Sequence, residues 1–281
     1  MKNKLFVLIS TMDSRILNLK SILCPYEKNI HYVISHQITQ DKGQDILDFI
    51  DILRKRKDVQ YSTLEGKGVA KNRNNTLKFI EPSSVCLVLD DDVVLCRNAF
   101  KMVSKSFDEN PPADFISFKI LDLEDQDYKP YPKAKQWHTL QTLTGIGTTE
   151  MAFRSDFILH NNVRFDERFG PGAENYPIGE DFIFAMDLYH LKTKMLFLPI
   201  PIVKHLRGST GMNLDQKVIF GRGAMFARVF GWKAFFIDFL FSIKKYPTYR
   251  KEISFVAYLL FLIKGTNSYF TSPVKRASCK N

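Results

Sequence analysis

Up to about residue 90 the chain alternates short apolar runs with amphipathic stretches, and this alternation restricts the fold more than any other sequence feature. Apolar runs predict strands at 5–9, 32–34, 59–62 and 85–89, and helical patterns predict helices at 45–57 and 68–80. Strand and helix in repetition indicate a doubly wound α/β sheet. Ligands bind such sheets beyond the carboxyl ends of the strands, so the residues after each strand are the first functional candidates.

An acidic triplet follows the last of these predicted strands. Asp90, Asp91 and Asp92 come directly after the apolar run 85–89, where adjacent carboxylates repel one another and lose hydration when partly buried. In an extended chain Asp90 and Asp92 point to one side and Asp91 to the other. Carboxylate and phosphate oxygens are the usual ligands of Mg²⁺ and Mn²⁺. The triplet therefore predicts a metal site, with a solvated acidic turn as the alternative.

The chain is long enough to bury a full core. Of its 281 residues 45% are hydrophobic, which suffices for one large domain or for one domain with a helical appendage. Its four cysteines lack metal-ligand spacing, which is typical of reduced thiols in a cytosolic protein. The apolar run near the N-terminus is followed by Asp13 and Arg15 without a cleavage site, so we interpret it as a strand rather than a signal peptide.

The excess of basic residues lies in the last quarter of the chain. From Lys204 onward there are 14 Lys and Arg against 3 Asp and Glu, whereas the preceding residues carry 26 against 27. Helical apolar runs occupy 218–230, 234–243 and 253–263, and the last two are well short of the roughly 20 residues that a spanning helix needs. We expect a basic helical extension, 211–281, that binds an anionic membrane leaflet or packs on the preceding domain, 1–210. No nucleic-acid-binding motif accompanies this charge, so nucleic acid is not an expected partner.

Three further segments stand in a definite order around the acidic strand. They are GKGVAKNRNNTL at 66–77, GTTEMAFRSD at 147–156 and FDERFGPGAENYPIGEDFIFAMDLY at 165–189. Together with the triplet they resemble glycosyltransferase family 2 of the GT-A fold, which carries an Arg-Asn segment, a DxD motif and a Glu-Asp helix in this order. The resemblance covers about residues 4–210 and implies a Rossmann-like α/β mixed sheet, followed here by the C-terminal helical extension.

The resemblance also implies a role for individual polar residues. Asp92 would bind the Mn²⁺ or Mg²⁺ ion that bridges the donor diphosphate, and His205 would be a further metal ligand, a structural histidine being the alternative. Glu180 and Asp181 open a helix, with Asp181 as general base and Glu180 in contact with the acceptor. The implied donor-binding residues are Thr11, Asp13, Arg15, Gln37, Lys71, Arg73, Asp90 and Asp91.

The chain departs from the family pattern beside the nucleotide. Many members have an aspartate after the second strand that holds uracil, whereas this chain has Ser35-His36-Gln37 there. Ser10 stands where a proline is usual. The Gln37 amide can still pair with a base edge. Segment 145–153, GIGTTEMAF, resembles the family segment between the donor and acceptor sites, where small residues let the backbone approach the sugar.

The implied function is that of a bacterial inverting glycosyltransferase of the hexosyltransferase class. It would move a sugar from a nucleotide-sugar donor, in the first place a UDP-sugar, to a glycan or lipid-linked acceptor in surface-polysaccharide synthesis. Such an enzyme would be cytoplasmic and peripheral to the inner face of the cell membrane. Two alternatives remain. A nucleotidyltransferase also uses carboxylates and Mg²⁺, but usually has a glycine-rich loop with a lysine near the first strand, and a non-catalytic membrane-associated protein could retain the same fold.

Overall fold

The computed structural model describes residues 4–41, 43–206 and 214–272. The chain divides into two compact units. The first comprises Met1–Glu167, Pro171–Ala173 and Glu180–Gly208, and the second comprises Arg168–Gly170, Glu174–Gly179 and Ser209–Asn281. The first unit contains the β-sheet and its helices, and the second contains the C-terminal helices.

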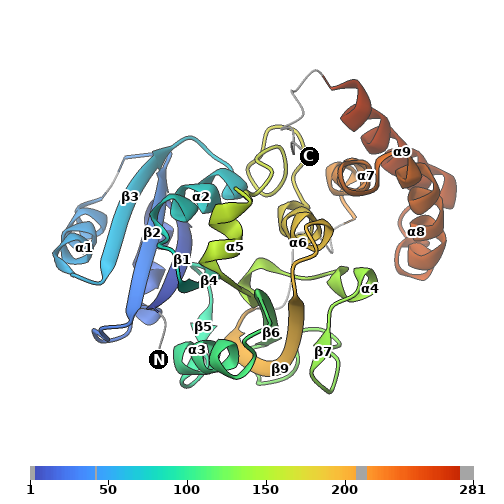
Figure 1. Ribbon diagram of the computed structural model, residues 1–281. Coiled ribbons are helices and arrows are strands. Elements are labelled where there is room, and N and C mark those ends of the chain that lie inside the picture. The colour runs from blue at the N-terminus through green and yellow to red at the C-terminus, as the bar shows by residue number, and fades with distance from the viewer. Residues whose placement is uncertain (1–3, 42, 207–213, 273–281) are drawn as a thin grey trace. The chain divides into compact units, whose positions relative to one another are not determined.

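The amino-terminal part of the first unit is a parallel α/β layer. Its strands are β1 (Lys4–Met12), β2 (Ile30–Ile38), β3 (Val59–Glu65) and β4 (Ser84–Asp90), which lie side by side in the order β3-β2-β1-β4 (Figure 1). A 3-10 helix, η1 (Asp13–Ser21), follows β1, and α1 (Gln44–Lys55) and α2 (Val69–Thr76) provide the crossovers to β3 and β4. The strands and helices expected from the alternation are confirmed, and each strand is somewhat longer than its apolar run.

Beyond β4 the sheet contains strands of both directions. The order continues β4-β8-β6-β9-β5, with β7 paired to β9. β8 (Met151–Arg154) is antiparallel to both β4 and β6 (Phe115–Leu121), and β6 is parallel to β9 (Met195–Lys204). The remaining elements are β5 (Val94–Leu95), β7 (Gln136–Trp137), α3 (Ala99–Glu109), α4 (Leu140–Leu143), α5 (Ser155–His160), α6 (Glu180–His190), η2 (Leu77–Phe79) and η3 (Thr148–Glu150). The sheet is therefore mixed, as expected.

Apolar side chains explain why these elements pack together. β4 is buried from Ser84 to Leu89, which is typical of a strand covered on both faces. α1 buries Ile46, Phe49, Ile50 and Leu53, one stripe at helical spacing. Full burial of such a side chain contributes about 1.5–3 kcal/mol to folding. This packing holds the carboxyl ends of β1 and β4 next to each other.

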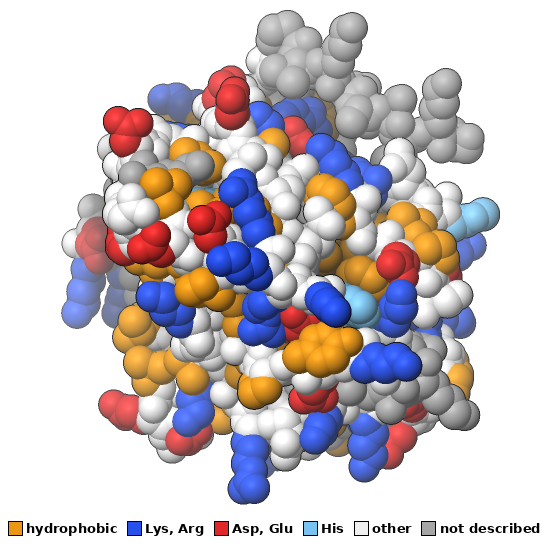
Figure 2. All heavy atoms as spheres, turned by 90° about the vertical axis from the view of Figure 1, so that its left-hand side faces the viewer, with side chains coloured by type: hydrophobic (Ala, Val, Ile, Leu, Met, Phe, Trp, Pro, Cys, Tyr) orange, Lys and Arg blue, Asp and Glu red, His pale blue; other side chains and the backbone are white. Residues whose placement is uncertain are grey.

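The surface around α1 and β3 is mixed in character. Viewed from that side, basic, acidic and apolar side chains are interspersed (Figure 2). This agrees with the nearly balanced charge of the chain before Lys204, where 26 Lys and Arg face 27 Asp and Glu. The visible face therefore offers no extended patch of a single charge sign.

The second unit is built from α7 (Gln216–Phe230), α8 (Ala234–Tyr249) and α9 (Phe255–Thr271), with the short η5 (Gly231–Lys233) before α8. The expected C-terminal helical extension is confirmed over the described residues 214–272. α7 and α9 approach closely because glycines lie at their crossing. A Cβ on Gly223 would lie 1.9 Å from the carbonyl oxygen of Leu262, and one on Gly265 would lie 1.8 Å from that of Phe220. Small residues permit this backbone contact, as they do between tightly packed helices in general.

The second unit also exposes many large apolar side chains. On η5 and α8 they recur three or four residues apart and form one stripe, and α9 adds more. The exposed residues are Trp232, Phe236, Phe239, Leu240, Ile243, Tyr246, Val256 and Leu260. Within the described ranges, no helix is both long enough and apolar enough to cross a membrane.

Candidate active site

The acidic triplet lies where two neighbouring parallel strands end. Ser10 of β1 pairs in register with Asp90, the last residue of β4. Thr11, which follows Ser10, is buried and accepts a hydrogen bond on its carbonyl from the Asn72 side chain, at 3.0 Å. The carboxyl ends of β1 and β4 and the α2 helix thus meet at the edge of the sheet where ligands are expected.

Arg15 neutralises two members of the triplet. Its guanidinium forms an ion pair with Asp91 and a second one, at 3.1 Å, with Asp92 Oδ2. Asp91 is only 2% exposed, and its burial raises its pKa to about 6 even though Arg15 opposes the shift. Asp91 and Arg15, which are both predicted to bind the donor, therefore pair with each other.

Arg73 connects three elements of the site. It is 4% exposed, donates to Asp90 Oδ1 at 2.8 Å and donates to Glu180 Oε1 at 2.9 Å. Arg73 lies on α2, Asp90 ends β4 and Glu180 begins α6. The two charge-assisted hydrogen bonds of Arg73 therefore hold α6 against the acidic strand. Sequence reasoning placed Arg73 in the donor site and Glu180 at the acceptor, and did not foresee that they pair with each other.

Asp92 and His205, the two predicted metal ligands, face each other. Asp92 Oδ1 lies 3.2 Å from His205 Nε2, and His205 Nδ1 lies 2.6 Å from the carbonyl oxygen of Leu206. Nδ1 therefore donates to that carbonyl, and the hydrogen bond with Asp92 raises the pKa of the imidazole. Neighbouring ligands about 2.1 Å from an octahedral ion are about 3 Å apart, so this pair fits two positions around one cation. Among the described residues, no group of three His, Cys, Asp or Glu forms a metal cluster.

The other predicted donor-binding residues are held by hydrogen bonds to the backbone. The Asp13 carboxylate accepts from the N–H and the hydroxyl of Thr39, both at 2.7 Å, and so orders the loop after β2. Gln37 donates to the carbonyl of Gly68 at 3.2 Å, and Lys71 donates to the carbonyl of Glu65 at 3.1 Å. These contacts shape the loops at the carboxyl ends of β1, β2 and β3.

Several buried polar atoms at this edge have no hydrogen-bond partner among the described residues. They are Ser10 Oγ on β1, and Asn72 Oδ1 and Arg73 Nε on α2. A buried donor or acceptor without a partner costs about 1–3 kcal/mol, so such atoms are rare in native proteins. Their concentration between β1 and α2, beside the triplet, indicates that a polar ligand or ordered water completes this site.

Glu180 and Asp181 differ in their surroundings. Glu180 is buried and paired with Arg73, whereas Asp181 forms no ion pair with the described residues and accepts from the N–H of Phe182 at 2.7 Å. Burial, and then the charge of Glu180, raise the pKa of Asp181 to about 7. A carboxylate that titrates near neutral pH is well suited to exchange a proton.

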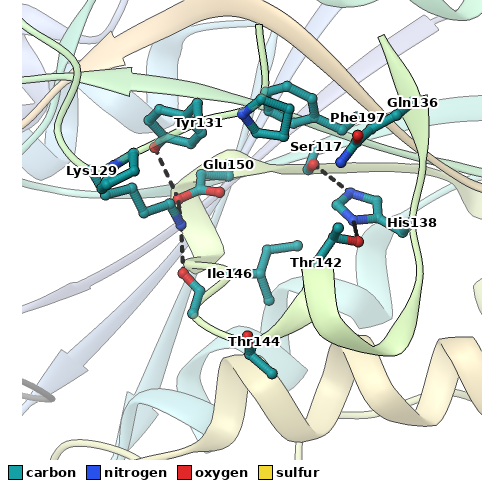
Figure 3. A pocket seen from close by; sticks show the side chains of 13 residues that line it. Ser117, Lys129, Tyr131, Gln136, His138, Thr142, Thr144, Ile146, Glu150 and Phe197 are labelled. Atoms are coloured by element: carbon teal, nitrogen blue, oxygen red, sulfur yellow. Dashed lines mark hydrogen bonds and ion pairs between the residues drawn. The ribbon is translucent and has the colours of Figure 1, made fainter. Parts of the chain in front are cut away.

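The first unit also contains a polar pocket, lined in part by Glu150, that sequence reasoning did not identify. It encloses about 330 Å³, and Figure 3 shows Lys129, Tyr131 and Glu150 on one side and the hydrogen-bonded Ser117 and His138 on the other. Glu150 lies in the segment expected between the donor and acceptor sites, but the others come from strands and from an irregular loop. No periodicity or motif in that loop distinguishes them.

The fold is a mixed α/β fold of the GT-A-like type. No protein-family model and no curated protein matches the chain. Solved structures of S. aureus TarS match it in fold. The TarS fragment 1–349 in complex with UDP-GlcNAc superposes with a TM-score of 0.61 at 14% identity, covering 95% of this chain and 91% of the fragment.

Two further TarS structures agree. The fragment in complex with UDP gives a TM-score of 0.59 at 17% identity, over 89% of this chain and 75% of the fragment. A larger TarS structure gives 0.59 at 17% identity over 86% of this chain, and the match spans only 43% of that larger chain. These TM-scores establish a common fold, whereas at identities of 14–17% the residue roles remain predictions.

Proposed function

We propose that this chain is a metal-dependent inverting glycosyltransferase that uses a nucleotide-sugar donor. The observation that carries the proposal is the concentration of buried, unpartnered polar atoms beside the Asp90-Asp91-Asp92 triplet, at the carboxyl edge of a GT-A-like sheet. A nucleoside diphosphate has the charge and the hydrogen-bonding groups that would satisfy such an edge. TarS, which shares the fold, binds UDP and UDP-GlcNAc. A UDP-sugar is therefore the first donor to test.

Asp92 and His205 would hold the cation, either Mn²⁺ or Mg²⁺. Both residue types suit Mn²⁺, and their 3.2 Å separation fits adjacent ligand positions. When bound, the cation would supply charge neutralisation for the departing diphosphate. Arg15 would remain on Asp91 and keep the triplet from repelling itself, and Asp90 would keep Arg73 in place.

Asp181 would act as the general base for the acceptor hydroxyl. Its pKa, raised mainly by burial, lies close to the operating pH, and it is not engaged in an ion pair with the described residues. A base opposite the leaving group gives direct displacement, which inverts the anomeric configuration. Glu180 would position α6 through its ion pair with Arg73. This role differs from the contact with the acceptor that the family resemblance implies.

We further propose that the second unit binds the cytoplasmic leaflet of the membrane, which would suit a lipid-linked acceptor in surface-polysaccharide synthesis. The α8 stripe exposes aromatic and aliphatic side chains such as Phe236 and Ile243. Three exposed lysines accompany the stripe: Lys233 at the end of η5, and Lys244 and Lys245 on α8. Each basic residue near an anionic surface contributes about 1 kcal/mol, and apolar side chains add to this by insertion.

A thermal-shift screen of nucleotide sugars, with and without Mn²⁺, tests the donor proposal. A ligand that binds the native state raises its melting temperature, so UDP-GlcNAc or another UDP-sugar should stabilise the protein more strongly when the metal is present. Stabilisation by a nucleoside triphosphate and a sugar phosphate, and not by nucleotide sugars, would favour a nucleotidyltransferase instead. Binding of a nucleotide sugar without any turnover would favour the non-catalytic alternative.

A further inference from the structure

The pocket beside Glu150 and His138 is large enough for a small ligand. Its volume of about 330 Å³ is near the lower end of the roughly 300–1,000 Å³ range of small-molecule pockets. This is room for a single ring with its substituents and too little for a whole nucleotide sugar. The residues that matter for the argument are Lys129, Tyr131, Gln136, His138, Glu150 and Phe197.

The charges inside the pocket are balanced. Glu150 is buried, and its Oε1 lies 2.5 Å from Lys129 Nζ and accepts from the Tyr131 hydroxyl at 3.2 Å. Burial lowers the pKa of His138 to about 4, so the imidazole is neutral near pH 7. Both ring nitrogens of His138 are engaged, with Ser117 Oγ at 2.7 Å and Thr142 Oγ1 at 3.0 Å. A pocket of this kind has no net charge with which to attract a phosphate or a carboxylate.

Polar capacity remains in the pocket after these contacts. Lys129 uses one N–H on Glu150 and one on the carbonyl oxygen of Gly145, at 2.5 Å, which leaves a third N–H. The Gln136 amide lines the pocket and forms no hydrogen bond with any described residue (Figure 3). Donors and acceptors therefore both remain for a ligand that carries hydroxyl groups.

Aromatic rings supply an apolar wall. The Tyr131 and Phe197 rings are stacked, with centroids 5.9 Å apart and planes 7° apart, and Phe197 lies edge-on to the His138 ring at 6.4 Å. A rigid aromatic wall beside a few placed polar groups suits a ring that is apolar on its face and polar at its rim. A neutral sugar has this character.

The pocket lies on the side of the candidate base. Glu150 immediately precedes β8, whose Ala152 pairs with Leu87 of β4, three residues before Asp90. α4, whose Thr142 lines the pocket, packs against α6, the helix that carries Asp181. The unpartnered atoms of the donor edge, in contrast, belong to β1 and α2.

We propose that this pocket binds a neutral, hydroxyl-rich sugar of the acceptor and thereby selects uncharged acceptors over phosphorylated or carboxylated ones. The proposal rests on the proposed glycosyltransferase function, since it assigns the acceptor side of that reaction. Lys129, Gln136 and Glu150 hydrogen-bond the sugar hydroxyls, and the Tyr131 and Phe197 rings enclose its apolar surface.

The test uses the full chain with UDP and Mn²⁺ present, and measures sugar binding by saturation-transfer NMR. The probes are the methyl glycosides of glucose, galactose and N-acetylglucosamine, with glucuronic acid and glucose 6-phosphate as anionic counterparts. Gln136→Ala and Glu150→Gln are compared with exposed control variants, Gln60→Ala and Glu109→Gln. Loss of one hydrogen bond should weaken binding of the neutral probe about three- to tenfold in the pocket variants, and leave it unchanged in the controls.

Three results would overturn the proposal. The first is unchanged binding of the neutral probe in Gln136→Ala, and the second is tighter binding of the anionic probes than of the neutral ones. The third is weaker binding of UDP-GlcNAc, but not of UDP, in the pocket variants, because this result would assign the pocket to the donor sugar. Gln136→Ala decides the matter if Glu150→Gln does not fold, because the Gln136 amide has no partner among the described residues. Failure of the unaltered chain to bind UDP would contradict the proposed function, and it would do so independently of the pocket.

Discussion

Replacement of Asp181 by asparagine should abolish most turnover and leave donor affinity intact. Asparagine keeps the size and one hydrogen-bond acceptor of aspartate but cannot take a proton. Loss of a general base typically lowers kcat about 10²- to 10⁴-fold. The KM for the donor should change little, because Asp181 is assigned to the acceptor hydroxyl and its carboxylate accepts from the N–H of Phe182 rather than from a residue of the donor edge. Steady-state measurement of UDP release from the accepted UDP-sugar is the assay.

The pH dependence sharpens this prediction. With the pKa of Asp181 raised to about 7 by burial, the ionised fraction grows from about one tenth at pH 6 to about nine tenths at pH 8. Turnover of the unaltered protein should therefore rise about tenfold over that range, and the residual turnover of Asp181→Asn should not. The folded-state pKa lies above the unfolded value, so ionisation destabilises the native state as the pH rises from about 4 to 8. Asp181→Asn should consequently gain melting temperature relative to the unaltered protein as the pH increases.

Glu180→Gln is the matched control. It removes a charge from the ion pair with Arg73 but retains an oxygen that accepts a hydrogen bond, so it should lower stability by less than the about 3–5 kcal/mol that loss of a buried partner costs. Turnover should still rise with pH, but the rise should move to lower pH, because the charge of Glu180 contributes to the raised pKa of Asp181. Near-normal turnover of Asp181→Asn together with an inactive, folded Glu180→Gln would refute the assignment of the base. Activity in both variants would refute the mechanism.

Three further outcomes concern the rest of the chain. Arg73→Met should lower the free energy of unfolding by about 3–5 kcal/mol in urea denaturation, since it leaves two carboxylates without their partner; a loss below 1 kcal/mol would show that the bridge is not formed. Gly223→Ala should destabilise the helical unit by about 1–3 kcal/mol or more, because the new Cβ would lie 1.9 Å from a carbonyl oxygen of α9. Gly221→Ala should have a milder effect, because its Cβ would lie 3.0 Å from a proline side chain. Equal melting temperatures of the two variants would contradict the close packing of α7 and α9. Phe236→Ser should weaken flotation on anionic vesicles, and high salt should weaken it further. Leu191→Ser, at an exposed apolar site outside the helical unit, should leave flotation unchanged. Equal flotation of both variants would show that the exposed stripe on α8 does not bind the membrane.

The parallel half of the fold was predictable because its signals are local. A continuous apolar run such as Val85–Leu89 is typical of a buried central strand, and α1 shows a clear helical stripe. The mixed half was expected from family resemblance alone. β5 and β7 have two residues each, and such strands are defined by their long-range partners instead of by their own pattern.

The structure brings several of the predicted site residues together, in pairings that the sequence does not reveal. The sequence singled out Asp92 and His205, and the structure brings them to 3.2 Å across 113 positions of chain. It also singled out Arg73 and Glu180 but assigned them to different substrates, because their ion pair joins two distant helices and depends on tertiary packing. Glu150 and its pocket were missed for the same reason, since they are assembled from several strands and a loop without a pattern.

Calorimetric titration of UDP with and without Mn²⁺ tests most directly whether a metal ion on Asp92 and His205 couples to binding of the nucleoside diphosphate. Mn²⁺ should tighten UDP binding to the unaltered protein, and this effect should be lost in Asp92→Ala and reduced in His205→Ala, with the metal-independent affinity retained. If Mn²⁺ strengthens UDP binding equally in all three proteins, the metal is held elsewhere and the proposed active site is wrong.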